Sequence, residues 1–117
     1  MKEKMKEKIE SNNECLLKNI EDIICSNFQI TREMLTSKPK EKHVLYANYV
    51  FSYIMRELGY SFSRISEKMK CSVGGAFKKV ISGEDIMKFI KTKKYLIHTI
   101  KKIREELESS GVKIKKN

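Results

Sequence analysis

Apolar side chains recur at helical spacing along most of the chain, and no segment alternates in the way of a β-strand. Residues 4–27 contain neither Pro nor Gly. Within them Leu16, Ile20, Ile23 and Ile24 fall at positions i, i+4, i+7 and i+8, which form one face of a helix. The sequence therefore predicts a first helix over about 4–27. Its charged N-terminal part is expected to fray, or to pair with another subunit.

A helix over about 41–58 is predicted to lie at the centre of the core. Its apolar side chains surround most of its circumference and leave only a narrow polar stripe, and Gly59 is expected to cap its C-terminal end. Before it, Thr31 is a candidate N-cap for a short helix over 31–36, and Pro39 ends that segment.

The C-terminal part repeats the amphipathic pattern. Leu96, Ile100, Ile103 and Leu107 fall at i, i+4, i+7 and i+11. This spacing predicts a last helix over about 92–108, followed by a basic tail.

Between the central and last helices, the pattern predicts two short helices joined by a tight polar turn at 70–72. Ser61 is a candidate N-cap for the first of them, in which Phe62, Ile65 and Met69 share a face. The arrangement is typical of a helix-turn-helix, whose second helix enters the major groove of DNA while the first braces it.

In the second helix of this pair, Phe77, Val80 and Ile81 share a face. We expect Phe77 and Val80 to pack against Ile65 and Met69 of the first helix. Residues 72–76 and one of the two following lysines would then face outward.

Three serines and a glycine set the expected ends of these elements. Ser72 would cap the second helix of the pair, as Ser61 caps the first. The pair Ser82-Gly83 is expected to end that helix, and Ser82 with Asp85 resembles the capping box of a further helix to about residue 90.

The charge distribution favours a polyanionic partner. The net charge is +10 and the sequence pI is about 9.5. Residues 31–83 carry 10 basic and 4 acidic side chains, and 84–117 carry 10 and 5, whereas 1–30 carry 5 and 6. Basic faces gain free energy on nucleic acid through counterion release. Because no apolar run reaches the roughly 18 residues needed to cross a bilayer, we expect a cytoplasmic, nucleoid-associated protein that binds no membrane.

The residues that carry most enzyme chemistry are sparse. Cys15, Cys25 and Cys71 are widely spaced, with only His43 and His98 as possible co-ligands, so no zinc site, disulfide framework or cofactor is predicted. No Gly-rich phosphate loop of the Walker A type and no paired carboxylates in a predicted cleft are found. We therefore expect a protein that is not an enzyme.

The stretch over residues 20–107 resembles the C-terminal DNA-binding domain of the bacterial chromosomal replication initiators, the DnaA family. The matching segments are Ile-Glu-Asp-Ile at 20–23, Leu-Thr-Ser-Lys at 35–38, Arg-Glu-Leu at 56–58 and Ser-Phe-Ser-Arg-Ile at 61–65, and the order of helices agrees. The resemblance implies a compact all-α domain with a helix-turn-helix of the TrpR-like superfamily around a central helix.

One spacing in the helix-turn-helix is similar to that of the family. From the isoleucine of the first helix to the anchoring residue of the recognition helix, the family has one residue more than many helix-turn-helix proteins. Ile65 and Phe77 are 12 positions apart, which resembles this longer form.

The resemblance also implies roles for single residues. Lys38, Lys40 and Lys42 lie in the basic connection that contacts phosphates in the family. Tyr46 stands where the family places a minor-groove arginine, and a tyrosine hydroxyl can still bond a phosphate or sugar. At the recognition helix, residues 70–76 replace the Gly-Gly-Arg-Asp-His-Thr-Thr-type run of the family, so its base-reading side chains are missing.

The glycines of this helix need an explanation, because a glycine in a helix interior lowers the stability of the helix by about 1 kcal/mol relative to alanine. Gly74 and Gly75 permit a close approach either to DNA or to another helix. In the first case Lys70, Lys78 and Lys79 would hold phosphates, and the sequence would be read weakly or through DNA shape.

The sequence as a whole predicts a helical extension over 1–19, a helix-turn-helix domain over 20–108 and a basic tail over 109–117. The predicted function is binding of double-stranded DNA, as an accessory or regulator of replication or transcription. The alternative is a protein-interaction domain with an initiator-like fold that has lost base readout, and the first helix could also form a homodimer. The candidate DNA-binding residues are Lys38, Lys40, Lys42, Tyr46, Ser61, Lys70, Ser72, Gly74, Gly75, Lys78 and Lys79.

Overall fold

Every regular element in the described part of the chain is an α-helix, which confirms the all-α fold class. The computed structural model describes residues 2–37, 41–88 and 94–111, with side-chain surroundings for 15–37, 41–88 and 96–111. The helices are α1 (Lys2–Phe28), α2 (Arg32–Thr36), α3 (Lys42–Glu57), α4 (Phe62–Met69), α5 (Val73–Lys88) and α6 (Lys94–Ser109). Among these residues, no helix is long and apolar enough to span a membrane.

Several predicted features lie outside the described residues. They are the stop at Pro39, the start of the last helix at Thr92, and positions 112–117 of the basic tail.

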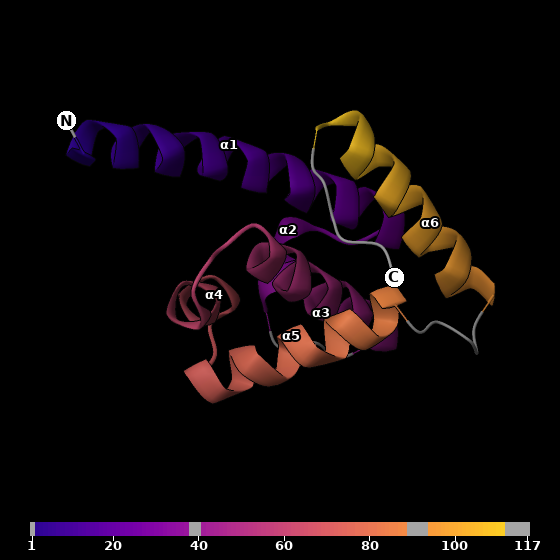
Figure 1. Cartoon of the computed structure of the whole chain (residues 1–117). Helices are drawn as coiled ribbons and strands as arrows, with labels where there is room; N and C mark the ends of the chain where they lie inside the picture. Colours follow the sequence, from indigo (N-terminus) through magenta and orange to yellow (C-terminus); the bar gives the residue numbers. More distant parts are fainter. Residues whose placement is uncertain (1, 38–40, 89–93, 112–117) are drawn as a thin grey trace.

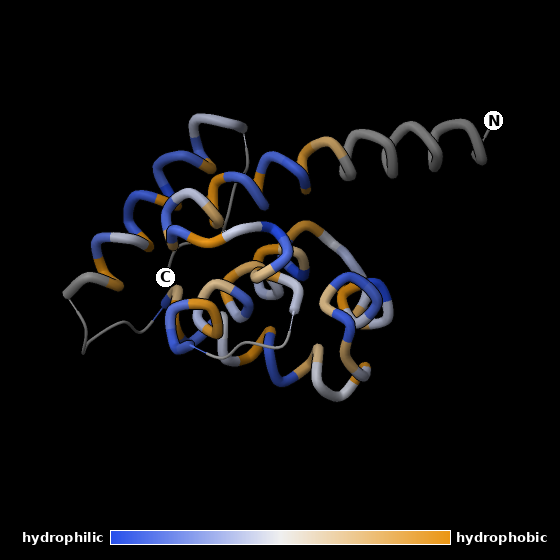
Figure 2. Tube along the Cα trace, turned by 180° about the vertical axis from the view of Figure 1, so that it is seen from behind, coloured by the Kyte–Doolittle hydropathy of each residue, from blue (hydrophilic) through white to orange (hydrophobic). Residues whose placement is uncertain are grey.

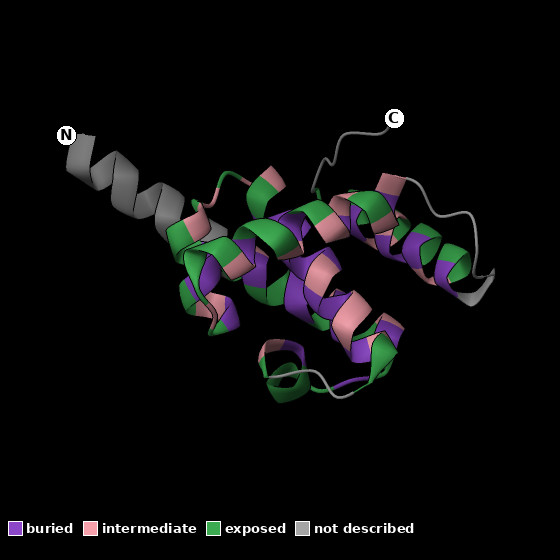
Figure 3. Cartoon of the chain, turned by 90° about the horizontal axis from the view of Figure 1, so that it is seen from below, coloured by how far each residue is buried: buried purple, intermediate pink, exposed green. Residues whose placement is uncertain are grey.

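The central helix is α3, as its nearly continuous apolar surface predicts. Nine of its 16 residues are buried, and it contacts α1, α2, α4 and α5. Figure 1 shows α3 in the middle of the molecule, with α1 and α2 on one side and α5 on the other, while α6 packs along α1. In Figure 2, hydrophobic positions (orange) occur along the helices near the centre of the molecule. In Figure 3, buried positions (purple) gather at the centre. The core therefore forms around α3 and holds α4 and α5 in place.

Three of the predicted N-caps are confirmed. The hydroxyl oxygens of Thr31, Ser61 and Ser72 each accept a hydrogen bond from the backbone N–H three residues later, at 3.1, 3.2 and 3.0 Å. Each cap satisfies one of the backbone donors that a helix leaves unpaired at its start. Gly59 follows the last turn of α3 with a φ of +99°, a left-handed conformation that glycine adopts without steric cost.

The predicted apolar face of α1 packs on the core. Ile20 and Ile24 are buried, Leu16 and Ile23 are partly buried against the core, and Leu17 is an additional buried residue that the spacing did not include. Both leucines border the same stripe, and the packing of α1 against α3 and α6 decides which one is enclosed. The predicted stripe of α6 is confirmed, since its four members are all buried: Leu96, Ile100, Ile103 and Leu107.

The expected break at Ser82-Gly83 is wrong, because α5 continues without interruption from Val73 to Lys88. A capping box at Ser82 and Asp85 is therefore absent from this helix. Gly83 is buried against α3, and a Cβ placed on it would lie 2.0 Å from the carbonyl oxygen of Tyr49. The glycine thus serves close helix packing instead of ending the helix.

A buried carboxylate links three of the helices. Glu21 on α1 is 5% exposed and forms ion pairs with Lys68 of α4 at 2.5 Å and with Arg32 of α2 at 3.8 Å. Arg32 also donates to Asp22 at 2.6 Å. These contacts fix α4 against the N-terminal helices, because a buried carboxylate is costly unless it is paired.

The three cysteines are free thiols, with Cys15 exposed, Cys71 partly buried and Cys25 buried. Burial raises the pKa of the Cys25 thiol, and the carboxylates of Glu21 and Asp22 raise it further. No cluster of potential metal ligands occurs in the described segments.

Candidate nucleic-acid interface

The two helices expected at 61–81 are present as α4 and the first half of α5. The turn between them depends on Lys70, whose φ of 55° is left-handed. The backbone N–H of Cys71 donates to the carbonyl of Ser66 at 3.0 Å and closes the end of α4. In Figure 1, α4 is seen almost end-on while α5 runs across the picture, so the two helices cross. The unit has the arrangement of a helix-turn-helix.

The face of α5 that meets the core differs from the prediction, because Phe77 and Ile81 do not share the buried face of Val80. Ile65 and Met69 are buried on α4, as expected, and Val80 is buried on α5. Phe77 is 49% exposed and meets only the edge of the Phe62 ring, with ring centroids 5.3 Å apart, so its expected place in the core is wrong.

The first fully buried side chain of α5 is instead Ala76, which had been expected to face outward. Ile65 and Ala76 are 11 positions apart. The interpretation of a longer spacing, which relied on Phe77, is therefore wrong. The residue of α5 that faces the core at this point is thus small, and α5 as a whole packs on α3.

The outward face of α5 carries a row of three apolar side chains. Val73, Phe77 and Ile81 are 49%, 49% and 47% exposed and follow each other at i, i+4 and i+8, and we call these three residues the α5 stripe. Gly74 lies next to the stripe, and a Cβ placed on it would have nothing within 4 Å. Lys78 is exposed one turn later on the same side. The surface predicted from hydroxyls, glycines and lysines thus also contains three exposed apolar side chains.

The glycines of α5 serve different purposes. No helix of the described chain approaches Gly74, whereas Gly75 is partly buried, with the Ser72 hydroxyl 3.2 Å from the position of a Cβ. Close packing against another helix of this chain is therefore not the reason for glycine at position 74.

The two neighbouring lysines of α5 have different surroundings. Lys78 is exposed, but Lys79 turns towards α3, where its ammonium donates to the Asn48 side chain at 2.6 Å and lies 5.8 Å from the Tyr49 ring. The Asn48 amide in turn donates to the carbonyl of Leu35 at 2.9 Å. Lys79 thus links α5 to α3, so its ammonium is not freely available to a phosphate.

Two arginines that were not among the predicted site residues lie near the ends of α3 and α4. Arg56 lies over the Phe62 ring at 4.4 Å, next to the contact of that ring with Phe77. Arg64 is exposed on α4, with its guanidinium 5.9 Å from the Tyr60 ring. Their positions depend on ring contacts across the turn between α3 and α4, which residue spacing alone does not reveal.

The remaining candidates are spread over this side of α3 and α4. Lys42 is exposed at the start of α3, and Tyr46 lies one turn later and is partly buried. The exposed Lys70 occupies the turn. The hydroxyl oxygens of Ser61 and Ser72 accept their cap hydrogen bonds, so each hydroxyl retains a donor for a partner. Lys38 and Lys40 lie outside the described residues.

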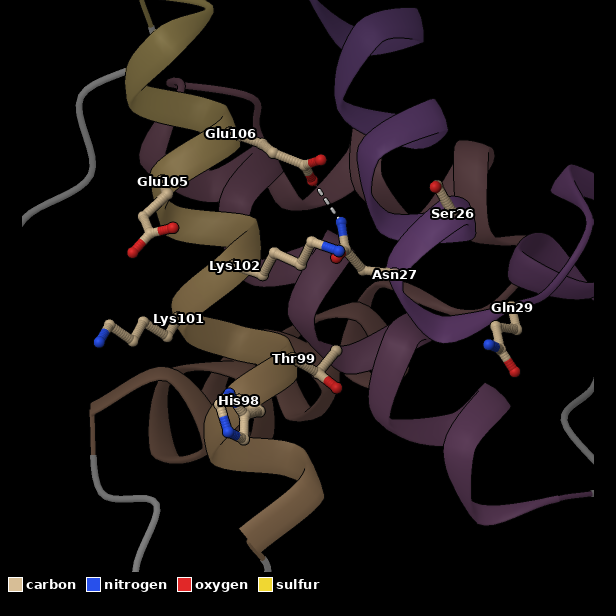
Figure 4. A pocket seen from close by; sticks show the side chains of 9 residues that line it. All are labelled: Ser26, Asn27, Gln29, His98, Thr99, Lys101, Lys102, Glu105 and Glu106. Atoms are coloured by element: carbon tan, nitrogen blue, oxygen red, sulfur yellow. Dashed lines mark hydrogen bonds between the residues drawn. The ribbon is translucent and has the colours of Figure 1, made fainter.

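A concave region, separate from the surface of α4 and α5, lies between the C-terminal end of α1 and α6. Figure 4 shows it from close by, with Asn27 donating to Glu106 across the gap and Lys101 pointing away from it. The cavity has a volume of about 540 Å³. Its walls mix acidic and basic side chains and include the exposed His98. It was not predicted, because its two walls are far apart in the sequence.

Comparisons with models of known protein families, with curated proteins and with solved structures gave no match. A function for this chain must therefore be inferred from its own residues and their geometry.

Proposed function

We propose that this protein binds double-stranded DNA through α4 and α5, with α5 as the helix that enters the major groove. The observation that carries the proposal is the uncovered outer face of α5 on a helix-turn-helix that also bears exposed cations. Arg64, Lys70 and Lys78 are all exposed on this unit. A groove-binding helix needs an accessible face, and phosphate contacts need free cations beside it.

The local architecture supports a rigid presentation of α5. Its inner side is held by Ala76, Val80 and Met87 in the core, and by the bond from Lys79 to Asn48. A recognition helix anchored in this way pays little conformational entropy on binding. The net charge of +10 adds a sequence-independent attraction to the duplex.

The role we propose is that of an accessory or regulator of replication or transcription, located at the nucleoid. The likeness of residues 20–107 to the initiator DNA-binding domain supports this role. The chain contains no Walker A sequence, so a nucleotide-driven motor function is not part of the proposal.

The proposal is tested by removing one charge at a time and measuring the affinity for a random-sequence duplex by fluorescence anisotropy. Lys78→Gln should weaken binding and lower the dependence of log affinity on log salt by about 1, because one phosphate contact is lost. Lys101→Gln removes the same charge from the exposed surface of α6 and should leave the affinity nearly unchanged. If both variants lose the same affinity, binding depends only on the total charge of the protein, and the proposed interface is contradicted.

Lys79→Gln provides a second control within α5. Because Lys79 bonds to Asn48, this substitution should lower the free energy of unfolding more than Lys78→Gln does. A loss of DNA affinity in a folded Lys79→Gln protein larger than that of Lys78→Gln would mean that the two lysines have been assigned the wrong roles.

A protein-interaction domain remains the second candidate, and the apolar character of the α5 stripe favours it. Exposed apolar side chains in a row are common at protein interfaces. A pulldown that recovers a defined protein, together with duplex pools that show no enrichment, would support this candidate over DNA binding.

A further inference from the structure

We propose that the α5 stripe recognises the C5-methyl groups of pyrimidines in the major groove, so that the protein prefers thymine-rich duplexes. This inference rests on the proposed binding of DNA and specifies what α5 reads there. Val73, Phe77 and Ile81 are the side chains concerned, and each is about half exposed.

The stripe lies where base contacts are made in a helix-turn-helix. Residues at the N-terminal end of the second helix approach the base edges. Val73 is the first residue of α5, and Phe77 follows one turn later. Between them Gly74 has open space around it, so the helix backbone itself can approach the floor of the groove.

The chemistry of this face restricts what it can read. Hydrogen-bond readout requires polar side chains on the outward face, and there only Ser72 and Lys78 can supply it, whereas Val73, Phe77 and Ile81 offer only hydrocarbon. Among the unmodified base pairs, only A·T presents an apolar group in the major groove, and this group is the C5-methyl of thymine. Contact of that methyl with the stripe removes apolar surface of both partners from water.

The charge of the α4–α5 unit favours DNA over a protein partner. Arg64 on α4, Lys70 in the turn and Lys78 on α5 are exposed cations that can contact the phosphates on either side of a groove. The exposed carboxylate of Asp85 continues the line of the stripe, but it lies beyond Ile81, away from the N-terminal end of the helix that approaches the bases.

The test compares four duplexes that differ in C5-methyl groups. The first is A·T-rich, the second has every thymine replaced by deoxyuridine, the third is G·C-rich, and the fourth has every cytosine replaced by 5-methylcytosine. Loss of each contacted methyl should weaken binding about fourfold, the fold-change that corresponds to roughly 0.8 kcal/mol for one buried methyl group. The methylated G·C duplex should bind more tightly than the unmodified one.

Two variants show whether the α5 stripe is responsible. Val73→Ser should reduce the difference between the thymine and uracil duplexes by about the fourfold of one methyl contact, while salt-dependent binding to both persists. Ile97→Ser alters an apolar side chain of α6 that is similarly exposed, at 44%, and should keep the full difference. Circular dichroism of both variants should match that of the unmodified protein, since neither side chain is in the core.

The outcomes separate this inference from the proposed function. Equal affinity for the thymine and uracil duplexes would overturn the inference and leave DNA binding standing. Absence of binding to all four duplexes would overturn the proposed function. If the protein is a dimer that Val73→Ser converts to a monomer, and all four duplexes bind equally, the stripe is a contact between chains and the inference is wrong.

Discussion

Replacing Gly83 by alanine should destabilise the protein, whereas the same change at Gly74 should stabilise it. Both glycines lie within α5, where alanine is favoured by about 1 kcal/mol through helix propensity. The two positions differ in what surrounds an added methyl group. At Gly74 nothing lies within 4 Å of the added Cβ, so no clash opposes the propensity gain, which is somewhat smaller than in a helix interior because Gly74 is the second residue of α5.

At Gly83 the added Cβ would meet the backbone of α3. It would lie 2.0 Å from the carbonyl oxygen and 2.7 Å from the carbonyl carbon of Tyr49, and ordinary contact begins at 3.4 Å. Because backbone atoms cannot rotate away, α5 must move off α3 by on the order of 1 Å, which disturbs the largest helix contact of the fold. Overpacking of this kind costs about 3 kcal/mol at the upper end of its usual range. The net loss after the propensity gain is about 2 kcal/mol.

Urea unfolding followed by far-UV circular dichroism measures both effects. The free energy of unfolding should fall by about 2 kcal/mol in Gly83→Ala and rise by about 0.5 to 1 kcal/mol in Gly74→Ala. A Gly83→Ala protein as stable as the unmodified one would show that α3 and α5 are further apart than described, and the account of the continuous helix would be wrong.

Two further predictions concern the supports of the fold. Glu21→Ala should lower the free energy of unfolding by about 1 to 2 kcal/mol, because Arg32 and Lys68 lose a charged partner but remain partly hydrated; an unchanged urea midpoint would contradict the ion-pair link. In thiol labelling at mildly alkaline pH, Cys15 should react first, and Cys25 should react only in denaturant because burial raises its pKa. Rapid labelling of all thiols in the native state would refute this order.

Local sequence rules correctly predicted the features that depend on a single helix. The caps at Thr31, Ser61 and Ser72 were predictable because each depends on a hydroxyl and a backbone N–H three residues away. The central position of α3 was predictable because its apolar surface surrounds most of the helix.

The wrong predictions concern residues whose surroundings are set by a neighbouring helix. Gly83 resembles a helix breaker in sequence, but its role comes from Tyr49 on α3. Phe77 was expected in the core because its spacing places it on a face with Val80, yet Ala76 is the residue that is buried there. Lys79 has its partner on another helix, 31 positions away along the chain. The candidate interface changed accordingly, from a surface of hydroxyls and lysines to an apolar stripe with cations beside it.

The measurement that tests the central claim most directly is the affinity of the protein for a random-sequence duplex over a series of salt concentrations. If α4 and α5 bind DNA as proposed, log affinity should fall linearly with log salt, with a slope of about −0.9 for each phosphate contacted. The slope should become less negative by about one contact in Lys78→Gln and stay the same in Lys101→Gln. Absence of binding at low salt, or an affinity that salt does not change, would contradict the account.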